Sequence, residues 1–301
     1  PGQGPSVRLL HVDGADVTIT DLALDGDRAH QTPDEHRAGI FAMHAPRLAL
    51  RRVDARNFTG DGFYIYDGSD DFTIDDVEAT GNGRNGITLG GLTSGGSIYG
   101  SRFVGNGAQQ IDSEPGRGWT VDGVLITGCT IDGAGVSGDY VLTMSGSGAA
   151  SRSRGWTVIG NVIIGATLAV WLDGSLIAGN TGVNPTAKPC YVVNRRSVGV
   201  TIAGNTCTMP PRAGPVAAIV EISGTSAANM PEVALLGNEL ASATATYGVR
   251  VHGAAVVYLD GNTLAGPGVA TAGGAGVYLR TTVIGAPMRI AVVSRTAIVG
   301  W

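Results

Sequence analysis

A short strand that ends in a polar pair recurs throughout the chain, about every 25 residues. Copies include LALRRVDA at 48–55, VTIAGNTC at 200–207 and VALLGNEL at 233–240. A second short strand follows each copy, for example DGFYIYD at 61–67. Both strands alternate apolar and variable residues, which is the period of a half-buried strand. A repeat this short cannot bury a core alone, but stacked copies can, because each coil packs on its neighbours.

This period predicts an all-β fold, a parallel β-helix (solenoid) of about ten to eleven coils. Strands of successive coils would pair in parallel, about 4.8 Å apart. We expect residues 1–301 to form one β-helix domain. The apolar end MRIAVVSRTAIVGW leaves a sheet edge without a polar cap. We therefore expect the chain to be a fragment of a longer one, or a partner subunit to cover this end.

Glycine supports the same fold, since 48 of the 301 residues are glycine. Glycine costs about 1 kcal/mol per position in a helix relative to alanine, so a helical bundle is disfavoured. In a solenoid, glycine supplies the positive φ that tight turns need. Asparagine follows glycine at equivalent turns, and we expect its amides to stack along the axis as a structural ladder. The ladder residues are Asn161, Asn180, Asn205, Asn238 and Asn262.

Charge and hydropathy exclude several partners. The net charge is -5, so the chain lacks the excess of positive charge that is typical of nucleic-acid-binding proteins. No apolar stretch reaches 18 residues, so we expect no membrane insertion. Three cysteines are too few for a disulfide framework. We expect Cys129, Cys190 and Cys207 to be buried free thiols, with a single disulfide as the alternative.

The second strand of each repeat places a mixed set of side chains on one outer stripe. Alternation puts Tyr64 and Tyr66 on this outer face, and aromatic residues are only 6% of the chain. Exposed rings beside carboxylates and arginines suit an extended sugar chain, because rings stack on sugar faces and polar groups bind hydroxyls. The candidate substrate-binding residues are Tyr64, Tyr66, Arg84, Trp171, Arg195, Glu221, Arg250, His252 and Tyr278.

Three carboxylates on this stripe are the candidate catalytic residues. Asp112 and Glu114 are two residues apart on one strand, so they point the same way, about 6.6–7 Å apart. We expect Asp173 in the same column, two coils from Glu114 and about 10 Å away. An inverting glycosidase needs two carboxyls about 6.5–9.5 Å apart. Glu114 would be the acid, its pKa raised by Asp112, and Asp112 or Asp173 the base. The alternative is a solvated pair on an exposed strand.

A second interpretation uses the residues that alternate in sign over successive coils. They form either a ladder of ion pairs or a site for uronic acids, in which arginine binds the carboxylate. In the second case Arg195 would be a lyase base, with Ca²⁺ held by neighbouring acids. Otherwise we expect no metal and no cofactor. The alternating residues are Asp173, Arg195, Glu221 and Arg250.

One charged insertion interrupts the early repeats, DGDRAHQTPDEHRAG at 25–39. It carries His30 and His36, and His44 follows it. Their spacing matches no metal-binding pattern. We expect the insertion to overhang the groove without holding a metal.

Several segments resemble right-handed parallel β-helix proteins that act on carbohydrate. They are VTITDLALDGDR, GDGFYIYDGSDDFTIDD, GNGRNGITL and QQIDSEPG. The resemblance is to phage tailspike depolymerases and the pectate-lyase-like superfamily, over about residues 10–285. It implies a right-handed coil, a polysaccharide substrate and an extracellular or virion-associated site. For tailspikes it also implies a homotrimer, and carboxylates on the helix face that match Asp112, Glu114 and Asp173. The polygalacturonase signatures NTD, GHG and RIK are absent.

Three functions therefore remain open from the sequence. The first is a glycan depolymerase that hydrolyses its substrate. The second is a uronate lyase or epimerase that uses the same face. The third is a non-catalytic receptor-binding or adhesin module.

Overall fold

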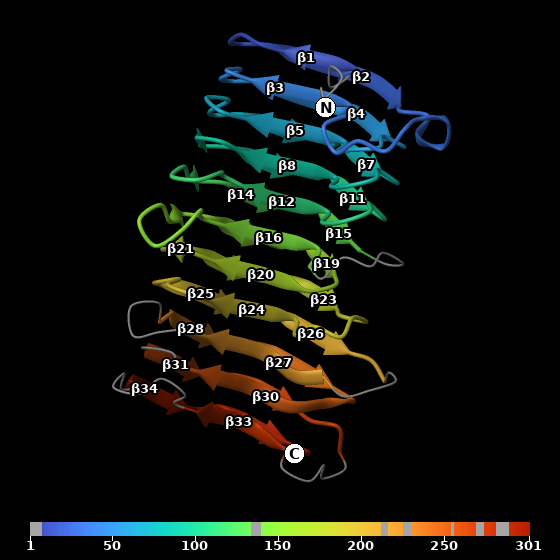
Figure 1. The fold of residues 1–301 in the computed structure, drawn as a ribbon. Coiled ribbons are helices and arrows are strands. Elements are labelled where there is room, and N and C mark those ends of the chain that lie inside the picture. The colour runs from blue at the N-terminus through green and yellow to red at the C-terminus, as the bar shows by residue number, and fades with distance from the viewer. Residues whose placement is uncertain are drawn as a thin grey trace.

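The predicted coils are present in the protein, for which a computed structural model describes residues 8–133, 140–211, 216–224, 230–253, 256–268, 274–280 and 289–301. One strand from each coil joins an eleven-stranded sheet, whose strands run in chain order down the stack (Figure 1). These strands are β1 (Leu10–Val12), β3 (Ile40–Met43), β5 (Phe63–Tyr66), β8 (Ile87–Gly90), β12 (Ile111–Glu114), β16 (Leu142–Ser145), β20 (Thr167–Val170), β24 (Tyr191–Asn194), β27 (Val216–Ser223), β30 (Ala245–His252) and β33 (Ala275–Arg280).

The rest of each coil contributes to a twenty-stranded sheet, in most coils as two short strands separated by a tight turn. Its strands are β2 (Thr18–Asp25), β4 (Ala49–Arg56), β6 (Thr73–Asp75), β7 (Glu78–Thr80), β10 (Ser97–Tyr99), β11 (Arg102–Val104), β14 (Leu125–Thr127), β15 (Thr130–Asp132), β18 (Thr157–Ile159), β19 (Val162–Ile164), β22 (Leu176–Ala178), β23 (Thr181–Val183), β25 (Val200–Ala203), β26 (Thr206–Met209), β28 (Glu232–Leu236), β29 (Glu239–Ser242), β31 (Val256–Asp260), β32 (Thr263–Ala265), β34 (Arg289–Ser294) and β35 (Ala297–Val299).

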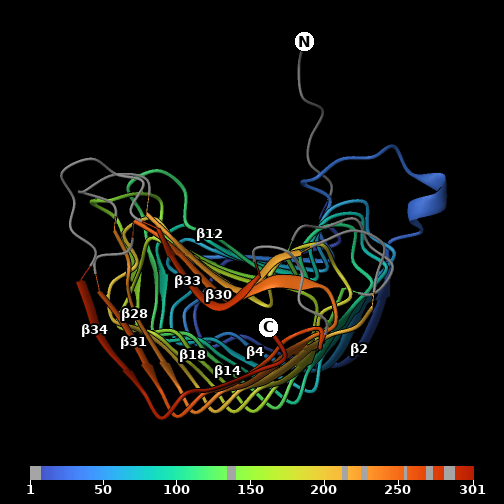
Figure 2. The ribbon, with the colours of Figure 1, turned by 90° about the horizontal axis from the view of Figure 1, so that it is seen from below.

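Smaller elements lie at the corners. Strands β9 (Thr93–Ser94) and β13 (Val121–Asp122) form one pair, and β17 (Ser153–Arg154) and β21 (Leu172–Asp173) form another. The only helical element in the described residues is a 3-10 turn, η1 (Arg28–His30), within the charged insertion. Seen along the stack, the two large sheets enclose the interior, and the segment with η1 protrudes at one corner (Figure 2).

The core is built from columns of apolar residues that face the axis. Every pair of neighbouring named strands is parallel, so equivalent residues lie above one another; Ile98 pairs with both Ile74 and Ile126. Each of these three side chains is fully buried. Because one coil buries its inward residues only against the next, this register confirms the stacked-coil prediction.

The asparagine ladder is confirmed, and its geometry explains the glycine beside it. Asn205 Nδ2 donates to Asn238 Oδ1 at 3.0 Å and to the carbonyl of Ile177 at 2.9 Å. Its own Oδ1 accepts from the backbone N–H of Asn180 at 2.9 Å. The preceding residue in this turn adopts a left-handed conformation, with φ of +59° at Gly204. That backbone favours glycine, which accounts for part of the glycine excess.

The cysteine prediction was wrong for two of the three residues. Cys190 and Cys207 form a disulfide across the core, and only Cys129 is a buried free thiol. Cys190 immediately precedes β24, and Cys207 lies in β26 on the other large sheet, two strands after β24 in the same coil. The pairing is therefore set by the path of one coil around its core, which cysteine spacing alone does not reveal.

Candidate functional site

A cluster of polar side chains covers the outer face of β5, β8 and β12. Asp112 and Glu114 both project from this face, as alternation predicts, because their neighbours Ile111 and Ser113 are buried toward the interior. We call the group the carboxylate cluster; it consists of Asp61, Arg84, Asn85, Thr88, Asp112 and Glu114.

Arg84 joins two of these carboxylates. Its Nη1 lies 3.0 Å from Asp61 Oδ2, and its Nη2 donates to Glu114 Oε1. The residue belongs to the turn GNGRNG, which runs very close to the preceding coil: a Cβ at Gly83 would come within 2.2 Å of the carbonyl oxygen of Thr59. Glycine is thus required at Gly83, and the close approach brings Arg84 over the cluster.

Asp61 is a site residue that the sequence interpretation missed. It is fully buried, and it accepts hydrogen bonds from the Asn85 N–H at 2.9 Å and the Thr88 hydroxyl at 2.8 Å. Burial raises the pKa of Asp61 to about 6, although Arg84 opposes this shift. Asp61 and Asn85 precede equivalent strands in DGFYIYD and NGITLGG. This equivalence is the one feature of the sequence that indicates that Asp61 and Asn85 lie on neighbouring coils.

Asp112 and Glu114 differ in their surroundings. Asp112 is 5% exposed and accepts a hydrogen bond of 3.3 Å from Asn85 Nδ2, whereas the Glu114 side chain is 39% exposed. Burial raises the pKa of Asp112 to about 8, helped by the negative charge of Glu114 and a hydrogen bond to it. Burial therefore favours the protonated form of Asp112, a residue for which the sequence analysis expected the role of base.

Aromatic rings border the carboxylate cluster. Tyr64 and Tyr66 lie on the outer face of β5 with ring centres 5.4 Å apart, and Tyr66 also meets Trp119 at 6.1 Å. Trp119, in the loop after β12, is 39% exposed and was not among the predicted residues. Burial raises the pKa of Tyr64, so its hydroxyl stays protonated. Gly90 lies between Tyr66 and Glu114, and Trp119 extends the aromatic surface beyond Tyr66.

The charged insertion reaches the cluster, as expected for a segment that overhangs the groove. Glu35 Oε2 lies 4.0 Å from Arg84 Nε, and the Thr59 hydroxyl donates to the carbonyl of Asp34 at 3.2 Å. Among the described residues, no group of three or more His, Cys, Asp or Glu side chains is arranged to hold a metal.

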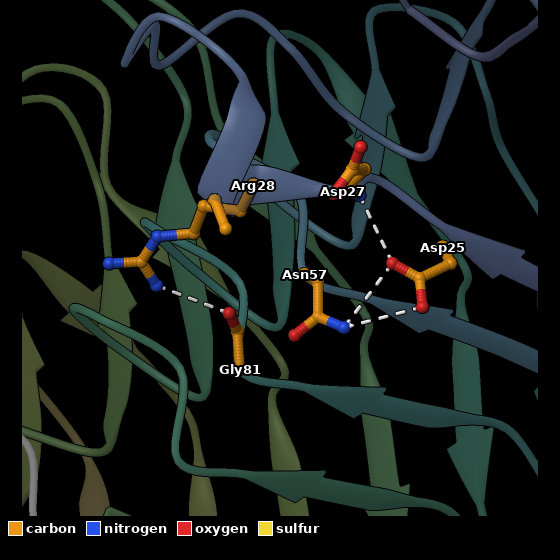
Figure 3. A pocket seen from close by; sticks show the side chains of 6 residues that line it. Asp25, Asp27, Arg28, Asn57 and Gly81 are labelled. Carbon is orange, nitrogen blue, oxygen red and sulfur yellow. Dashed lines mark hydrogen bonds between the residues drawn. The ribbon is translucent and has the colours of Figure 1, made fainter.

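A pocket of about 510 Å³ lies beside the insertion, where β2 and β4 end (Figure 3). Its polar groups bond to one another: Asp25 accepts from the Asp27 N–H and from Asn57 Nδ2, and Arg28 Nη1 donates to the carbonyl of Gly81 at 3.2 Å. The Asp25 carboxylate is therefore already paired, and Asp27 Oδ1 lies 2.7 Å from His30 Nδ1. The pocket thus offers no reactive group comparable to the carboxylate cluster.

Asp173 does not belong to the column of Glu114, contrary to the prediction. The outward residues of β20 are Leu168 and Val170, which pair with Thr143 and Ser145 of β16. Asp173 lies in β21, beyond a turn, and its Oδ2 pairs with Arg152 at 2.9 Å. The segment LAVWLDG is apolar at five consecutive positions, so its alternation does not determine which of its side chains face outward.

Trp171 and Arg195 also lie outside the strands, at equivalent turn positions on neighbouring coils. Both have left-handed backbones, with φ of +54° and +56°, where Gly91 and Gly253 occupy the corresponding turns. The Arg195 guanidinium lies over the Trp171 ring, 5.7 Å from its centre. Since Asp173 pairs with Arg152 instead, the predicted run of alternating charges through Arg195 is not present.

Four predicted binding residues come together at the other end of the eleven-stranded sheet. Arg250 lies between Glu221 and Tyr278 on adjacent strands, and His252 follows it on the same face. Arg250 Nε donates to His252 Nε2, and Arg250 Nη1 is 4.0 Å from Glu221 Oε2. The predicted site residues thus divide into two clusters and a turn pair, rather than one continuous stripe.

Comparison with known proteins identifies the fold class. Residues 11–210 match the family model described as right handed beta helix region, so the chain belongs to that family. No curated protein sequence matches the chain significantly. Within its described residues, no helix is long and apolar enough to cross a membrane.

Solved structures show which proteins share this fold. The tailspike protein gp49 from Pseudomonas phage LKA1 aligns with a TM-score of 0.68 at 14% identity, over 95% of this chain and 49% of the tailspike. The A-module of Azotobacter vinelandii mannuronan C-5 epimerase AlgE6 aligns with 0.54 at 16% identity, over 94% and 74%. DFA-IIIase from Arthrobacter chlorophenolicus A6 without its lid aligns with 0.50 at 14%, over 93% and 70%. The chain spans about half the length of the tailspike.

Proposed function

We propose that the protein is a glycan depolymerase that hydrolyses its substrate at the carboxylate cluster. The observation that carries this proposal is the contrast on β12, where a protonated, buried Asp112 adjoins the exposed Glu114. Glycoside hydrolysis needs one carboxylic acid and one carboxylate in this combination. The fold likeness to a phage tailspike and to a mannuronan epimerase supports a polysaccharide as the substrate class.

In this mechanism Asp112 gives its proton to the glycosidic oxygen while the bond from that oxygen to the anomeric carbon breaks. Glu114 takes a proton from the water that attacks the same carbon, so the product carries a new reducing end. The hydrogen bond between Asp112 and Glu114 then offers a path that returns the proton to Asp112.

Inversion requires the pair to separate when substrate binds. Carboxyl groups joined by a hydrogen bond lie closer than the roughly 6.5–9.5 Å that an inverting hydrolase uses. Rotation of the exposed Glu114 side chain away from Asp112 would admit the water and uncover the acid. Tyr66 and Trp119 would hold the sugar ring on the adjoining side through stacking.

The setting of the enzyme follows from the same proposal. A disulfide between Cys190 and Cys207 suits an oxidising environment, which supports an extracellular or virion-associated protein. The homotrimer implied by the resemblance to tailspikes remains a prediction of the same proposal.

A product assay tests the reaction class. The protein is incubated with pectate, alginate, hyaluronan and bacterial capsular polysaccharides, and the products are followed by reducing-end assay, near-ultraviolet absorbance and proton NMR of the anomers. Hydrolysis predicts new reducing ends without absorbance, with inverted anomeric configuration. Retained configuration would reject the inverting step, and binding to a polymer without turnover would indicate an adhesin.

The second candidate is a uronate lyase or epimerase at the same cluster. Arg84 and the protonated Asp112 are suited to bind a uronate carboxylate, which would acidify the neighbouring C–H proton. Glu114 would then be the base, in place of Arg195, because Arg195 lies in a turn several coils away. An absorbing, unsaturated product indicates the lyase, and exchange of solvent deuterium into an uncleaved polymer indicates the epimerase.

A further inference from the structure

The outer face of β27, β30 and β33 carries a second cluster of polar and aromatic side chains, remote from the carboxylate cluster. Strand pairing arranges it as two short rows across the sheet. We call it the C-terminal cluster; its rows are Glu221, Arg250 and Tyr278, and Ser223, His252 and Arg280.

Two tyrosines add an aromatic surface to this cluster. Tyr247 and Tyr278, on neighbouring strands, stack with ring centres 4.5 Å apart and planes inclined by 19°. His252 lies 6.3 Å from the Tyr278 ring. The stacked rings stand beside the guanidinium groups, which is the combination of aromatic face and charged donor that acidic sugars require.

Positive charge is in excess in the C-terminal cluster. Two arginines, Arg250 and Arg280, face a single carboxylate, Glu221, on this part of the sheet. Burial lowers the pKa of His252, and the charges of Arg250 and Arg280 lower it further, while Glu221 opposes them. Two arginines against one carboxylate leave this face with a net positive charge, which favours an anionic ligand.

The two clusters are separated by strands with uncharged outer residues. Three strands, β16, β20 and β24, lie between β12 and β27, so the clusters are about 19 Å apart at the usual strand spacing of about 4.8 Å. The outward residues of these strands include Thr143, Leu168 and Val192, which carry no charge. The C-terminal cluster is therefore spatially separate from the carboxylate cluster.

We infer that the C-terminal cluster is a second glycan-binding site, which takes an anionic sugar residue of the same polysaccharide chain that the carboxylate cluster cleaves. This inference rests on the proposed function. Arg250 and Arg280 would bind the sugar carboxylate, and the tyrosine stack would contact the ring. A polymer held at both clusters gains affinity because the second contact is intramolecular. Short oligosaccharides, which cannot span the clusters, lose this gain.

Binding of defined polymers tests the inference independently of turnover. We titrate three acidic polymers, polygalacturonate, alginate and hyaluronan, into the protein at 0.15 M salt, with neutral dextran as the comparison. The same titrations are made with wild type and with the variants Arg280→Gln, Arg250→Gln and Glu114→Gln. We expect an acidic polymer to bind and dextran not to, with Kd raised about tenfold or more by each arginine change, since each removes a charge-assisted hydrogen bond. Glu114→Gln should slow cleavage by about 100-fold or more while leaving this binding in place.

Two further readouts complete the test. Arg102→Gln, an exposed arginine on the twenty-stranded sheet, is the matched control and should leave Kd unchanged. In NMR titrations the pKa of His252 should rise when an acidic polymer binds, because the polymer charge offsets the two arginines. Equal Kd in wild type and Arg280→Gln, equal binding of dextran, or no binding of any acidic polymer would each overturn the inference. If an acidic polymer binds in a way that depends on Arg280 but is not cleaved, the proposed hydrolase activity is contradicted and the second binding site is not.

Discussion

Asp112 and Glu114 project from the same face of one strand, yet Asp112 is 5% exposed while the Glu114 side chain is 39% exposed. Asn85 donates a hydrogen bond to Asp112, whereas Glu114 pairs with Arg84. Two carboxyl groups of the same chemistry thus meet different environments. That asymmetry separates their roles and leads to the predictions below.

The stability of the protein should fall as the pH rises from about 4 to about 8. The folded pKa of Asp112, about 8, is above its ordinary value of about 3.9, so the folded state holds a proton that the unfolded state releases. Its contribution is complete below about pH 4 and is lost as the pH passes the folded value. Urea midpoints at several pH values should show this fall, and Asp112→Asn should remove the part above about pH 6 while leaving the part below it to which Asp61 contributes. A variant with the wild-type pH dependence would contradict the raised pKa.

Asp61→Asn should slow catalysis while the fold is kept. Asp61 holds Arg84 at 3.0 Å, and a displaced Arg84 would misplace Glu114; misplacement of about 1 Å costs about 100-fold in rate. Because the charge of Asp61 also raises the pKa of Asp112, the alkaline limb of kcat/KM should move to lower pH. A loss of activity with an unchanged pH profile would mean that Asp61 serves only the fold.

Asn205→Ala should destabilise the protein by about 2–4 kcal/mol. The change leaves the buried N–H of Asn180 and the carbonyl of Ile177 without partners, and each unsatisfied group costs about 1–3 kcal/mol. Urea unfolding measures the loss, with Thr201→Ala on the outer side of the same coil as the control. Equal stability of the two variants would show that the ladder contributes nothing.

Reduction of the disulfide should lower stability by about 3 kcal/mol, the value for a loop of this size. Cys190 and Cys207 are 17 residues apart. Dithiothreitol should shift the urea midpoint of wild type and of Cys129→Ala equally, and should leave the double variant Cys190→Ala with Cys207→Ala unaffected. A shift in that double variant would point to another reducible group.

Much of the fold was predictable because one short repeat must satisfy the same packing rule in every coil. The parity of IDSE placed Asp112 and Glu114 correctly, since Ile111 marks the buried face. The same alternation gave the wrong outward residues for LAVWLDG, because apolar residues occupy both faces there and the strand ends before Trp171.

The site was predictable only in part because its contacts join residues from different coils. Asp61 and Arg84 stand in turns before their strands, and only the stacking of coils brings them to Glu114. The sequence also does not show burial, so it gave no sign that the pKa of Asp112 is raised. The sequence did not predict Trp119 as a site residue, because the loop that carries it has no equivalent in the other repeats.

The most direct test of the central claim is the rate at which the protein releases reducing ends from a polysaccharide that it cleaves. This rate is compared between wild type, Asp112→Asn and Glu114→Gln. The control is Glu239→Gln, a change at an exposed glutamate on the twenty-stranded sheet. We predict that each change in the carboxyl pair lowers kcat by about 100-fold or more with the fold intact, the usual worth of a general acid or base. Glu239→Gln should retain wild-type activity. Full activity in either Asp112→Asn or Glu114→Gln would contradict the account.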